Sequence, residues 1–496
     1  MMGRLVKILI LLFSVSLYAQ EGARYLIITY DNFYNIVQEL AQWKHQKGMK
    51  CKVVRLSEIG NNASAIRNYV INAYNNWNPK PEYLLIVGSA NLVTSYFYSQ
   101  GQQNRIYTDS YYGDVTGDFR ADICYGRLPC RTAQQCSVMV KKILIYEKTP
   151  TVADSLWMVK GVGIVNEDGS SDDTIYWNNV RFACQLMGQA NFLQVDTFSR
   201  FRGHNASNVI SAVNDGRGIV LYRGNATNNW YTPFNVNVQL TNNGTRLPII
   251  ASITCQTMSL SPYESMVGET WLRVGTTSSL KGAVAFFGNT HSGTNLAGVR
   301  GACTRGFFRT LFSDNYQLGK AVLAAKESIY ARFYNQIEYY GFNLLGDPEL
   351  NVLTGIPQKL QVIYPETIPI GRQNISIAVE RLGRRIQNAL VCLWKGEEVY
   401  AYDYTDSSGE VNLLINPATE GEMLLTVTAR NSIPFEARIV CSNLTAIQEP
   451  IKKAERVDSR EGRIYDFSGR RRFSPFSPGI YFIEKGGKIE KVLIYK

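Results

Sequence analysis

Short apolar runs that alternate with helix-patterned segments constrain the fold of this 496-residue chain more than any other feature. The first series contains YLIITY, KCKVVRL and YLLIVG, and the second contains KGVGIV, GIVLYRG, LPIIASITC and KGAVAFFGNTH. Apolar strands separated by helices indicate a mostly parallel sheet covered by helices on both faces. We therefore expect two α/β units, residues 24–150 and 151–354, each built on its own mostly parallel sheet.

The pattern changes after Pro357 to short alternating strands separated by turns, as in ALVCLWKGEEVYAYDYTDSSGEVNLLI. This pattern predicts a small, immunoglobulin-like β-sandwich over residues 357–444. A charged linker follows, and then GRIYDFSGRRR and SPGIYFIEKGGKIEKVLIYK, in which glycines at turn positions separate apolar strands. We expect residues 445–496 to form this linker and a small all-β tail.

The N-terminus has the composition of an export signal. Arg4 and Lys7 precede an apolar run, residues 8–15, and polar residues begin at Gln20. This pattern predicts a secretory signal peptide over residues 1–19, and hence a protein that is secreted or attached to the cell surface. The apolar run is shorter than the roughly 18 residues of a membrane helix, and no later segment reaches that length. We therefore expect no transmembrane segment.

The formal charge of +11 raises the question of a nucleic-acid partner. Lys and Arg are scattered along the chain, and their densest run, Arg470 to Arg472, lies in the tail. We attribute the charge to solubility or surface adhesion and expect no nucleic-acid partner. The sequence has no phosphate loop, HExxH motif or dinucleotide fingerprint, so we expect no organic cofactor.

Cys255 is the one of nine cysteines whose context suggests chemistry. It follows a very apolar strand, so its thiol would emerge at the carboxyl edge of a parallel sheet, where catalytic groups commonly lie. A thiolate nucleophile also needs backbone N–H donors for the oxyanion, which Gln256 and Thr257 could supply. The alternative is that Cys255 is a small, buried apolar side chain without a catalytic role. Cys392 and Cys441 are the pair that a structural disulfide could join.

The order of several motifs resembles the gingipain family of cysteine peptidases over residues 24–353. The motifs are YLLIVG, TDSYYGD, YGRLP, KKILIYEK, GIVNEDG, LYRGNATNNW, LPIIASITC, GAVAFFGNT and NLLGDPEL. The resemblance implies a caspase-like α/β fold with a cysteine nucleophile after one strand and a histidine after the preceding strand. It also implies that Cys255 matches the nucleophile and Glu167 the acid that assists the histidine.

The histidine itself is missing, because Gly224, Asn225 and Ala226 stand where the family has Gly-His-Gly. An amide cannot accept a proton from sulfur, although Asn225 could position a water or donate to an oxyanion. Tyr176 and Trp177 occupy the region where the family's acidic specificity residue is expected. Arginine-specific cleavage is therefore not implied.

The sequence has three histidines, and each is a candidate replacement for the missing one. His45 is expected to be solvated on a charged helix, and His204 to be a cap or surface residue. His291 ends the strand after Cys255 and would emerge at the same sheet edge, either as a relocated base or as a structural residue. As a relocated base, it should bring a ring nitrogen within about 4 Å of the Cys255 sulfur.

Four aspartates lie among glycines at turn-like spacing: Asp109, Asp114, Asp118 and Asp122. Their oxygens suit a hard cation, and the resemblance implies a structural calcium. The alternative is a set of surface turns capped by their own aspartates.

Two functions follow from these observations. The first is a secreted thiol protease that attacks protein or peptide substrates through Cys255, weakened by the missing histidine. The second is a pseudoenzyme that keeps the fold as a surface binding or adhesion module. In both cases the tail resembles the C-terminal sorting domains of the type IX secretion system, which implies that machinery as a partner.

Overall fold

The computed structural model describes residues 20–101, 104–148, 150 and 155–443, together with five segments in the tail, 452–454, 463–466, 470–472, 479–485 and 488–494. The predicted signal peptide lies outside the described residues. Among the residues that are described, no helix is both long enough and apolar enough to cross a membrane.

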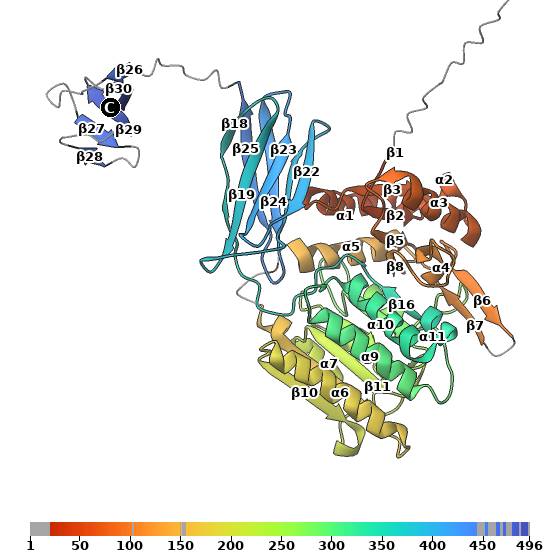
Figure 1. The fold of residues 1–496 in the computed structure, drawn as a ribbon. Coiled ribbons are helices and arrows are strands. Elements are labelled where there is room, and N and C mark those ends of the chain that lie inside the picture. The colour runs from red at the N-terminus through yellow and green to blue at the C-terminus, as the bar shows by residue number, and fades with distance from the viewer. Residues whose placement is uncertain are drawn as a thin grey trace, which may run out of the picture.

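A ten-stranded sheet forms the centre of the α/β region (Figure 1), in the order β10-β9-β11-β14-β15-β16-β8-β5-β2-β3. Its strands are β2 (Tyr25–Thr29), β3 (Cys51–Arg55), β5 (Tyr83–Val87), β8 (Cys124–Leu128), β9 (Lys160–Asn166), β10 (Gln194–Ser199), β11 (Ile219–Gly224), β14 (Ile249–Ser252), β15 (Ala285–Asn289) and β16 (Phe342–Leu345). The predicted strands are therefore present in one continuous sheet.

The expectation of two separate sheets is wrong, because strand β16 joins them. It pairs antiparallel with β15 through four residues and parallel with β8 through Leu345 and Arg127. Consequently the strands of the first half run opposite to those of the second half. The carboxyl ends of β9, β11, β14 and β15 thus share an edge with the start of β16.

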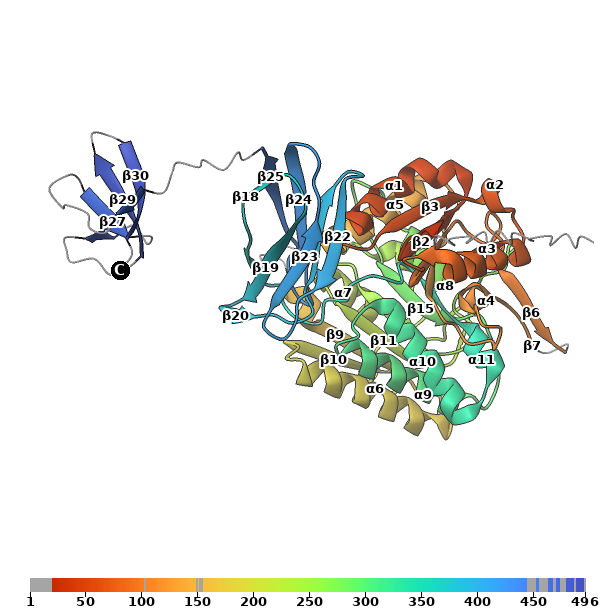
Figure 2. The same cartoon turned by 45° about the horizontal axis from the view of Figure 1, so that its top comes forward.

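Alternating side chains on the strands explain how both faces are covered. On β2, Tyr25 and Ile27 face one core, and Leu26 and Ile28 face another. Helices α6, α9 and α10 lie side by side over one face of the second half (Figures 1 and 2). The main helices are α1 (Tyr34–Gln46), α3 (Ala63–Asn76), α5 (Ala133–Lys148), α6 (Asp172–Gln189), α7 (Ala206–Asp215), α8 (Val267–Arg273), α9 (Ala297–Leu311), α10 (Leu318–Phe333) and α11 (Gln336–Gly341).

Short elements complete the α/β region. They are β1 (Gln20–Glu21), α2 (Leu56–Ile59), β4 (Trp77–Asn78), the hairpin of β6 (Tyr96–Gln100) and β7 (Asn104–Thr108), α4 (Ser110–Gly113), and the pair β12 (Ala226–Thr227) and β13 (Asn229–Trp230). The hairpin and the β12–β13 pair matter for function, since both lie beside strand ends of the second half.

Two facing sheets enclose a second core between residues 361 and 442, built on side chains such as Ile377, Val391 and Leu425. One sheet contains β17 (Gln361–Ile363), β19 (Gln373–Arg381), β20 (Arg384–Arg385) and β23 (Glu410–Ile415). The other contains β18 (Thr367–Pro369), β21 (Leu390–Lys395), β22 (Val399–Tyr404), β24 (Gly421–Thr428) and β25 (Phe435–Ser442). Five tail strands, β26 (Lys452–Ala454), β27 (Arg463–Asp466), β28 (Arg471–Arg472), β29 (Gly479–Lys485) and β30 (Lys488–Ile494), pair in a sheet of their own.

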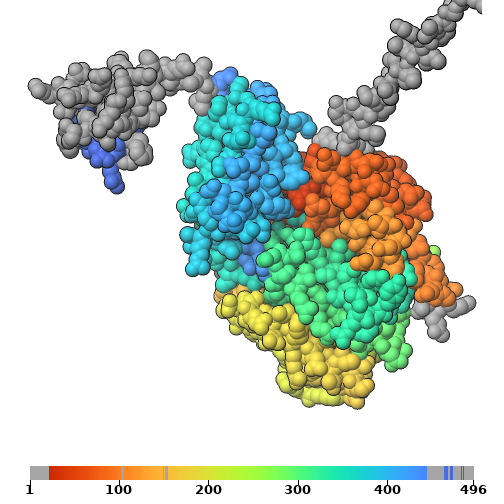
Figure 3. All heavy atoms as spheres, viewed as in Figure 1, coloured from red at the N-terminus to blue at the C-terminus, as the bar shows by residue number. Residues whose placement is uncertain are grey.

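The sandwich packs against helix α1 (Figure 3). The Tyr400 hydroxyl donates to the His45 carbonyl at 2.8 Å, and the Gln46 amide donates to Glu436 at 2.7 Å. The His45 ring meets Trp394 edge-on and Tyr400 at a tilt, and burial together with Lys50 lowers its pKa to about 4. The expectation that His45 is solvated is therefore wrong, because the sandwich covers it.

Cys392 and Cys441 are both free thiols. They lie on β21 and β25, which are separated by β24. Strands two positions apart are about 9–10 Å from each other, and a disulfide needs Cα atoms within about 7 Å. The predicted bridge is therefore wrong.

Candidate active site

The carboxyl edge of the second half brings together four segments that the sequence singled out. Strands β9, β11, β14 and β15 are parallel neighbours. Immediately beyond their ends stand Glu167 and Asp168, Asn225, Cys255 and His291 respectively. The edge predicted from strand-end residues is confirmed, although their contacts differ from the expected ones.

Asn225 is fully engaged at the position of the family histidine. Its side-chain amide donates to Asp168 at 2.7 Å, and its oxygen accepts from the Tyr176 hydroxyl at 3.5 Å. Hydrogen bonds from Ser170 and from Asn225 hold the pKa of Asp168 below its ordinary value. This pair therefore offers an ionised carboxylate and an amide, and neither exchanges protons readily near neutral pH.

Glu167 faces away from this pair. Its buried carboxylate accepts hydrogen bonds from Trp177 at 3.1 Å, from the Ser199 hydroxyl at 2.5 Å and from the Arg200 backbone at 2.8 Å. Asp168, not Glu167, is therefore the carboxylate in contact with Asn225, and the role of Glu167 as the assisting acid stays a prediction. The two carboxylates are adjacent in sequence, and only the backbone direction after β9 decides which one faces the site.

The Cys255 sulfur is in contact with a cation. The Nη1 group of Arg300, in the first turn of α9, donates to Sγ at 2.8 Å. The thiol also makes a long contact of 3.8 Å with the Gly293 carbonyl. The residue that touches the predicted nucleophile is thus one that the sequence analysis did not single out.

Arg300 belongs to a buried network that ends at His291. Its Nε and Nη2 groups donate to the two oxygens of Glu338 at 2.9 Å each, and His291 Nδ1 lies 2.7 Å from Glu338 Oε1. Burial opposes the charge of Glu338, but Arg300 and His291 lower its pKa to about 2. Cys255, Arg300, Glu338 and His291 therefore form one connected chain of contacts.

His291 is not the group that contacts the sulfur. Across the described part of the chain, neither ring nitrogen is hydrogen-bonded to Cys255, and Nε2 has no hydrogen-bond partner. Glu338 fixes the ring through Nδ1, which is how a carboxylate orients a catalytic imidazole. The described residues thus show no hydrogen bond between the ring and the sulfur, and the ring is held with Nε2 unoccupied.

The two predicted oxyanion donors differ. The Thr257 backbone N–H donates to the Asn289 carbonyl at 3.1 Å, so it is not available. The Gln256 N–H has no hydrogen-bond partner among the residues described. Gln256 is therefore the donor that can meet an oxyanion formed at Cys255.

A second arginine lies behind the nucleophile. Arg223, on β11, is completely buried and donates to the Asn179 amide oxygen at 3.1 Å, to the Ala297 carbonyl at 3.0 Å and to the Ile253 carbonyl. Burial lowers its pKa to about 10, so it remains charged at neutral pH. In the described part of the chain its hydrogen bonds go to neutral oxygens, and the Tyr176 ring faces its guanidinium at 5.1 Å, so its positive charge lies close to the strand before Cys255 without a carboxylate partner.

A cavity of about 270 Å³ opens beside Cys255 and His291, between the loop after Cys255 and the β6–β7 hairpin. Its lining includes Gln256 and Thr290, the direct sequence neighbours of the two residues. Phe97, Tyr107, Leu260 and Glu264 also line it. The volume suits a single side chain, with aromatic walls and a carboxylate at hand.

The four aspartates expected to bind calcium serve separate local contacts. Asp109 forms a buried ion pair with Arg127 at 2.6 Å. Asp114 accepts from the Gly117 backbone at 2.6 Å, and Asp122 accepts from the Val115 backbone at 2.8 Å. Asp118 accepts from the Arg120 backbone at 3.0 Å. The structure does not bring the four together, so calcium binding stays a prediction.

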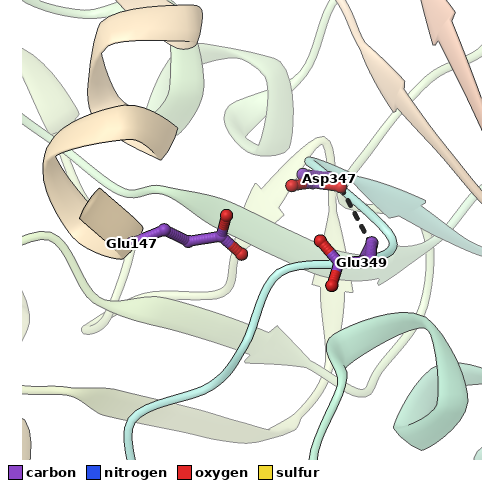
Figure 4. Close-up of side chains that lie close together, drawn as sticks. All are labelled: Glu147, Asp347 and Glu349. Atoms are coloured by element: carbon purple, nitrogen blue, oxygen red, sulfur yellow. Dashed lines mark hydrogen bonds between the residues drawn. The ribbon is translucent and has the colours of Figure 1, made fainter. Parts of the chain in front are cut away.

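Within the described residues, one acidic cluster has metal-like spacing: Glu147, Asp347 and Glu349 (Figure 4). The ammonium group of Lys44 lies 2.8, 2.5 and 2.6 Å from these three carboxylates, and Lys47 lies 2.6 Å from Glu349. The lysines therefore occupy the space that a cation would need, and the cluster is a buried ion-pair network.

A cysteine at the carboxyl edge of a largely parallel sheet, close to a histidine that a carboxylate orients, is an arrangement used in nucleophilic thiol catalysis. Residues 18–353 match Peptidase family C25, and the chain belongs to this family.

Gingipains are among its relatives. A Lys-gingipain of Porphyromonas gingivalis is 22% identical over 486 residues, covering 88% of this chain and 27% of the relative. Gingipain R2 of the same species is 21% identical over 434 residues, covering 84% of this chain and 57% of the relative. The complex of P. gingivalis RgpB pro- and mature domains superposes with a TM-score of 0.76 at 18% identity, covering 84% of this chain and 100% of that one. The structural similarity confirms the caspase-like α/β fold expected from the motifs.

Proposed function

We propose that the chain is an exported cysteine peptidase in which Cys255 attacks the substrate and His291, from the strand after the nucleophile, replaces the missing histidine. The observation that carries this proposal is the Glu338–His291 contact of 2.7 Å, which leaves Nε2 unoccupied at the sheet edge that also bears Cys255. Glu338 thereby orients the ring so that Nε2 can exchange a proton with a bound substrate.

The proposed reaction uses His291 on the leaving group. The Cys255 thiolate attacks the peptide carbonyl carbon, and the oxyanion that forms accepts the Gln256 N–H. The C–N bond then breaks as the amine nitrogen takes a proton from His291 Nε2. Water then attacks the thioester carbon while His291 Nε2 takes a proton from it, and the C–S bond breaks to release the carboxylic acid and restore the Cys255 thiolate. Because His291 does not touch the sulfur, it cannot generate the thiolate directly, and we expect slow turnover.

The substrates are proteins or peptides whose side chain next to the scissile bond enters the cavity beside Gln256 and Thr290. Aromatic walls favour a large side chain, and the lining carries both a carboxylate, Glu264, and a guanidinium, Arg105, so it selects no single charge. Trp177 is engaged with Glu167, and Tyr176 with Asn225, so neither offers an acidic pocket for arginine.

Hydrolysis of a fluorogenic peptide library by the full chain, Cys255→Ala and His291→Gln tests the proposal. We expect measurable cleavage by the wild type and none by Cys255→Ala. His291→Gln should lose about 10²–10⁴-fold, the usual contribution of acid–base catalysis. Equal cleavage by wild type and His291→Gln would exclude the histidine role.

A second function, a non-catalytic binding module, is favoured by the Asn225–Asp168 hydrogen bond at 2.7 Å. That bond occupies the position of the family histidine without providing a proton acceptor. No cleavage of any library member, combined with retention of an uncleaved peptide by wild type and Cys255→Ala alike, would support this second function.

Export also belongs to the proposal. The predicted signal peptide over residues 1–19 would direct the chain out of the cytoplasm, and the tail after residue 445 would act as a type IX sorting domain. The sandwich of residues 361–442 would serve as its immunoglobulin-like neighbour. The paired strands β26 to β30 support the tail as a separate unit of structure.

A further inference from the structure

We infer that Arg300 is the counter-ion that holds Cys255 in its thiolate form. It takes the place of the imidazolium that the family histidine, expected at position 225 after β11, would provide. This inference rests on the proposed function only in taking Cys255 as the nucleophile. It addresses the step that His291 cannot perform, since the His291 ring is not bonded to the sulfur.

The guanidinium is fixed in place for this role. Two of its nitrogens bind the two oxygens of Glu338, and the third donates to Sγ at 2.8 Å. The Arg300 side chain is 6% exposed and that of Glu338 is 0% exposed. A planar cation held by a bidentate ion pair has little freedom to leave the sulfur, and a charged donor strengthens its hydrogen bond to an anion.

The charges around the sulfur favour losing its proton. Arg300 and Arg223 are positive and Glu338 is negative, so these three buried groups carry a net charge of about +1. Burial opposes the charge of Arg300, but Glu338 and Cys255 outweigh it and raise the Arg300 pKa. A thiolate at Cys255 would bring the buried cluster to neutrality.

The other groups that face the sulfur do not reverse this balance. Tyr176, on α6, and Tyr222, on β11, are both neutral, because burial raises their pKa values. Asp168 is bound to Asn225, and Asp172 begins helix α6 at the surface. The long contact with the Gly293 carbonyl is the one interaction that a thiolate would lose.

The test is the pH dependence of alkylation at Cys255 in the full chain, using iodoacetamide and mass spectrometry of the peptide that contains Cys255. A free thiol titrates near about 8.5, and a neighbouring cation lowers that midpoint by about one to three units. We expect such a lowered midpoint in the wild type, a return to about 8.5 in Arg300→Met, and an intermediate value in Arg300→Lys. The same midpoint in wild type and Arg300→Met would overturn the inference.

Arg300→Met leaves Glu338 buried without its partner, so a second variant separates folding from chemistry. Arg300→Met combined with Glu338→Gln removes both charges together, and it should fold and show the same raised midpoint. His291→Gln should keep the low midpoint while hydrolysis falls. A low midpoint in a wild type that cleaves no peptide would overturn the proposed function and leave the role of Arg300 standing.

Discussion

Asn225 and Asp168 are joined by a hydrogen bond of 2.7 Å at the ends of two neighbouring strands, β11 and β9. The carboxylate is therefore positioned to orient whatever side chain stands at residue 225. An imidazole there would meet an acid that is already in place.

Asn225→His should therefore raise activity. The new imidazole would donate one N–H to Asp168 and offer its other nitrogen toward the end of β14, and acid–base catalysis typically contributes about 10²–10⁴-fold. The measurement is kcat/KM on the best peptide of the library. Asn225→Ala is the control and should give no gain, since it removes the amide without adding a base. A gain in both variants would point to relief of crowding instead.

Lys44→Met should be strongly destabilising. The Lys44 ammonium contacts Glu147, Asp347 and Glu349, and removing it leaves three buried carboxylates with only Lys47 nearby. Loss of one partner from a buried ion pair costs about 3–5 kcal/mol of unfolding free energy. Urea unfolding measures it, with Lys47→Met as the matched control. Equal, small losses in both variants would show that the carboxylates take up protons without cost.

Acidification should loosen the contact between the sandwich and helix α1. The pKa of His45 is lowered to about 4, so the unfolded chain binds a proton there more readily than the folded protein does. Stability from this residue is therefore complete above about pH 6.5 and falls as the pH drops from about 6.5 toward 4. In His45→Phe, the melting temperature should change less with pH between about 6.5 and 4 than it does in the wild type. An unchanged slope in His45→Phe would contradict the assignment.

Deleting residues 452–496 should leave a folded protein that is not delivered. The α/β region and the sandwich have their own cores, and the residues of those cores lie upstream of the deletion. In a host with type IX secretion we expect the truncated protein in the periplasm, with the melting temperature of the full chain. Normal surface delivery of the truncated protein would refute the sorting role.

Strand positions were predictable from sequence because apolar runs such as LPIIASITC are buried on both sides. Strand β16 was missed, since its four residues lie inside GFNLLGDPEL between a helix and a turn. The pairing partner of so short a segment depends on where the chain returns, which local pattern does not encode. The pairing that unites the two halves into one sheet could therefore be recognised only in the structure.

The site was predictable as an edge but not as a set of contacts. Cys255, Asn225 and His291 could be placed because each follows a strand in a parallel sheet. Arg300 reaches the sulfur from helix α9, across 45 residues of sequence, and Glu338 reaches His291 from helix α11, across 47. Such contacts depend on how helices pack. Neither Arg300 nor Glu338 stands in a sequence motif that indicates a catalytic role, so the sequence did not identify them.

Strand β16 also has a consequence for how the chain is made. Because it lies between β15 and β8, the first half of the sheet keeps an open edge until Leu345 has been synthesised. Residues 20–148 cannot finish as an independent folding unit ahead of the rest, so the α/β region should fold and unfold in a single cooperative transition. A newly made chain would thus acquire the edge that bears Asn225, Cys255 and His291 only when the whole sheet closes.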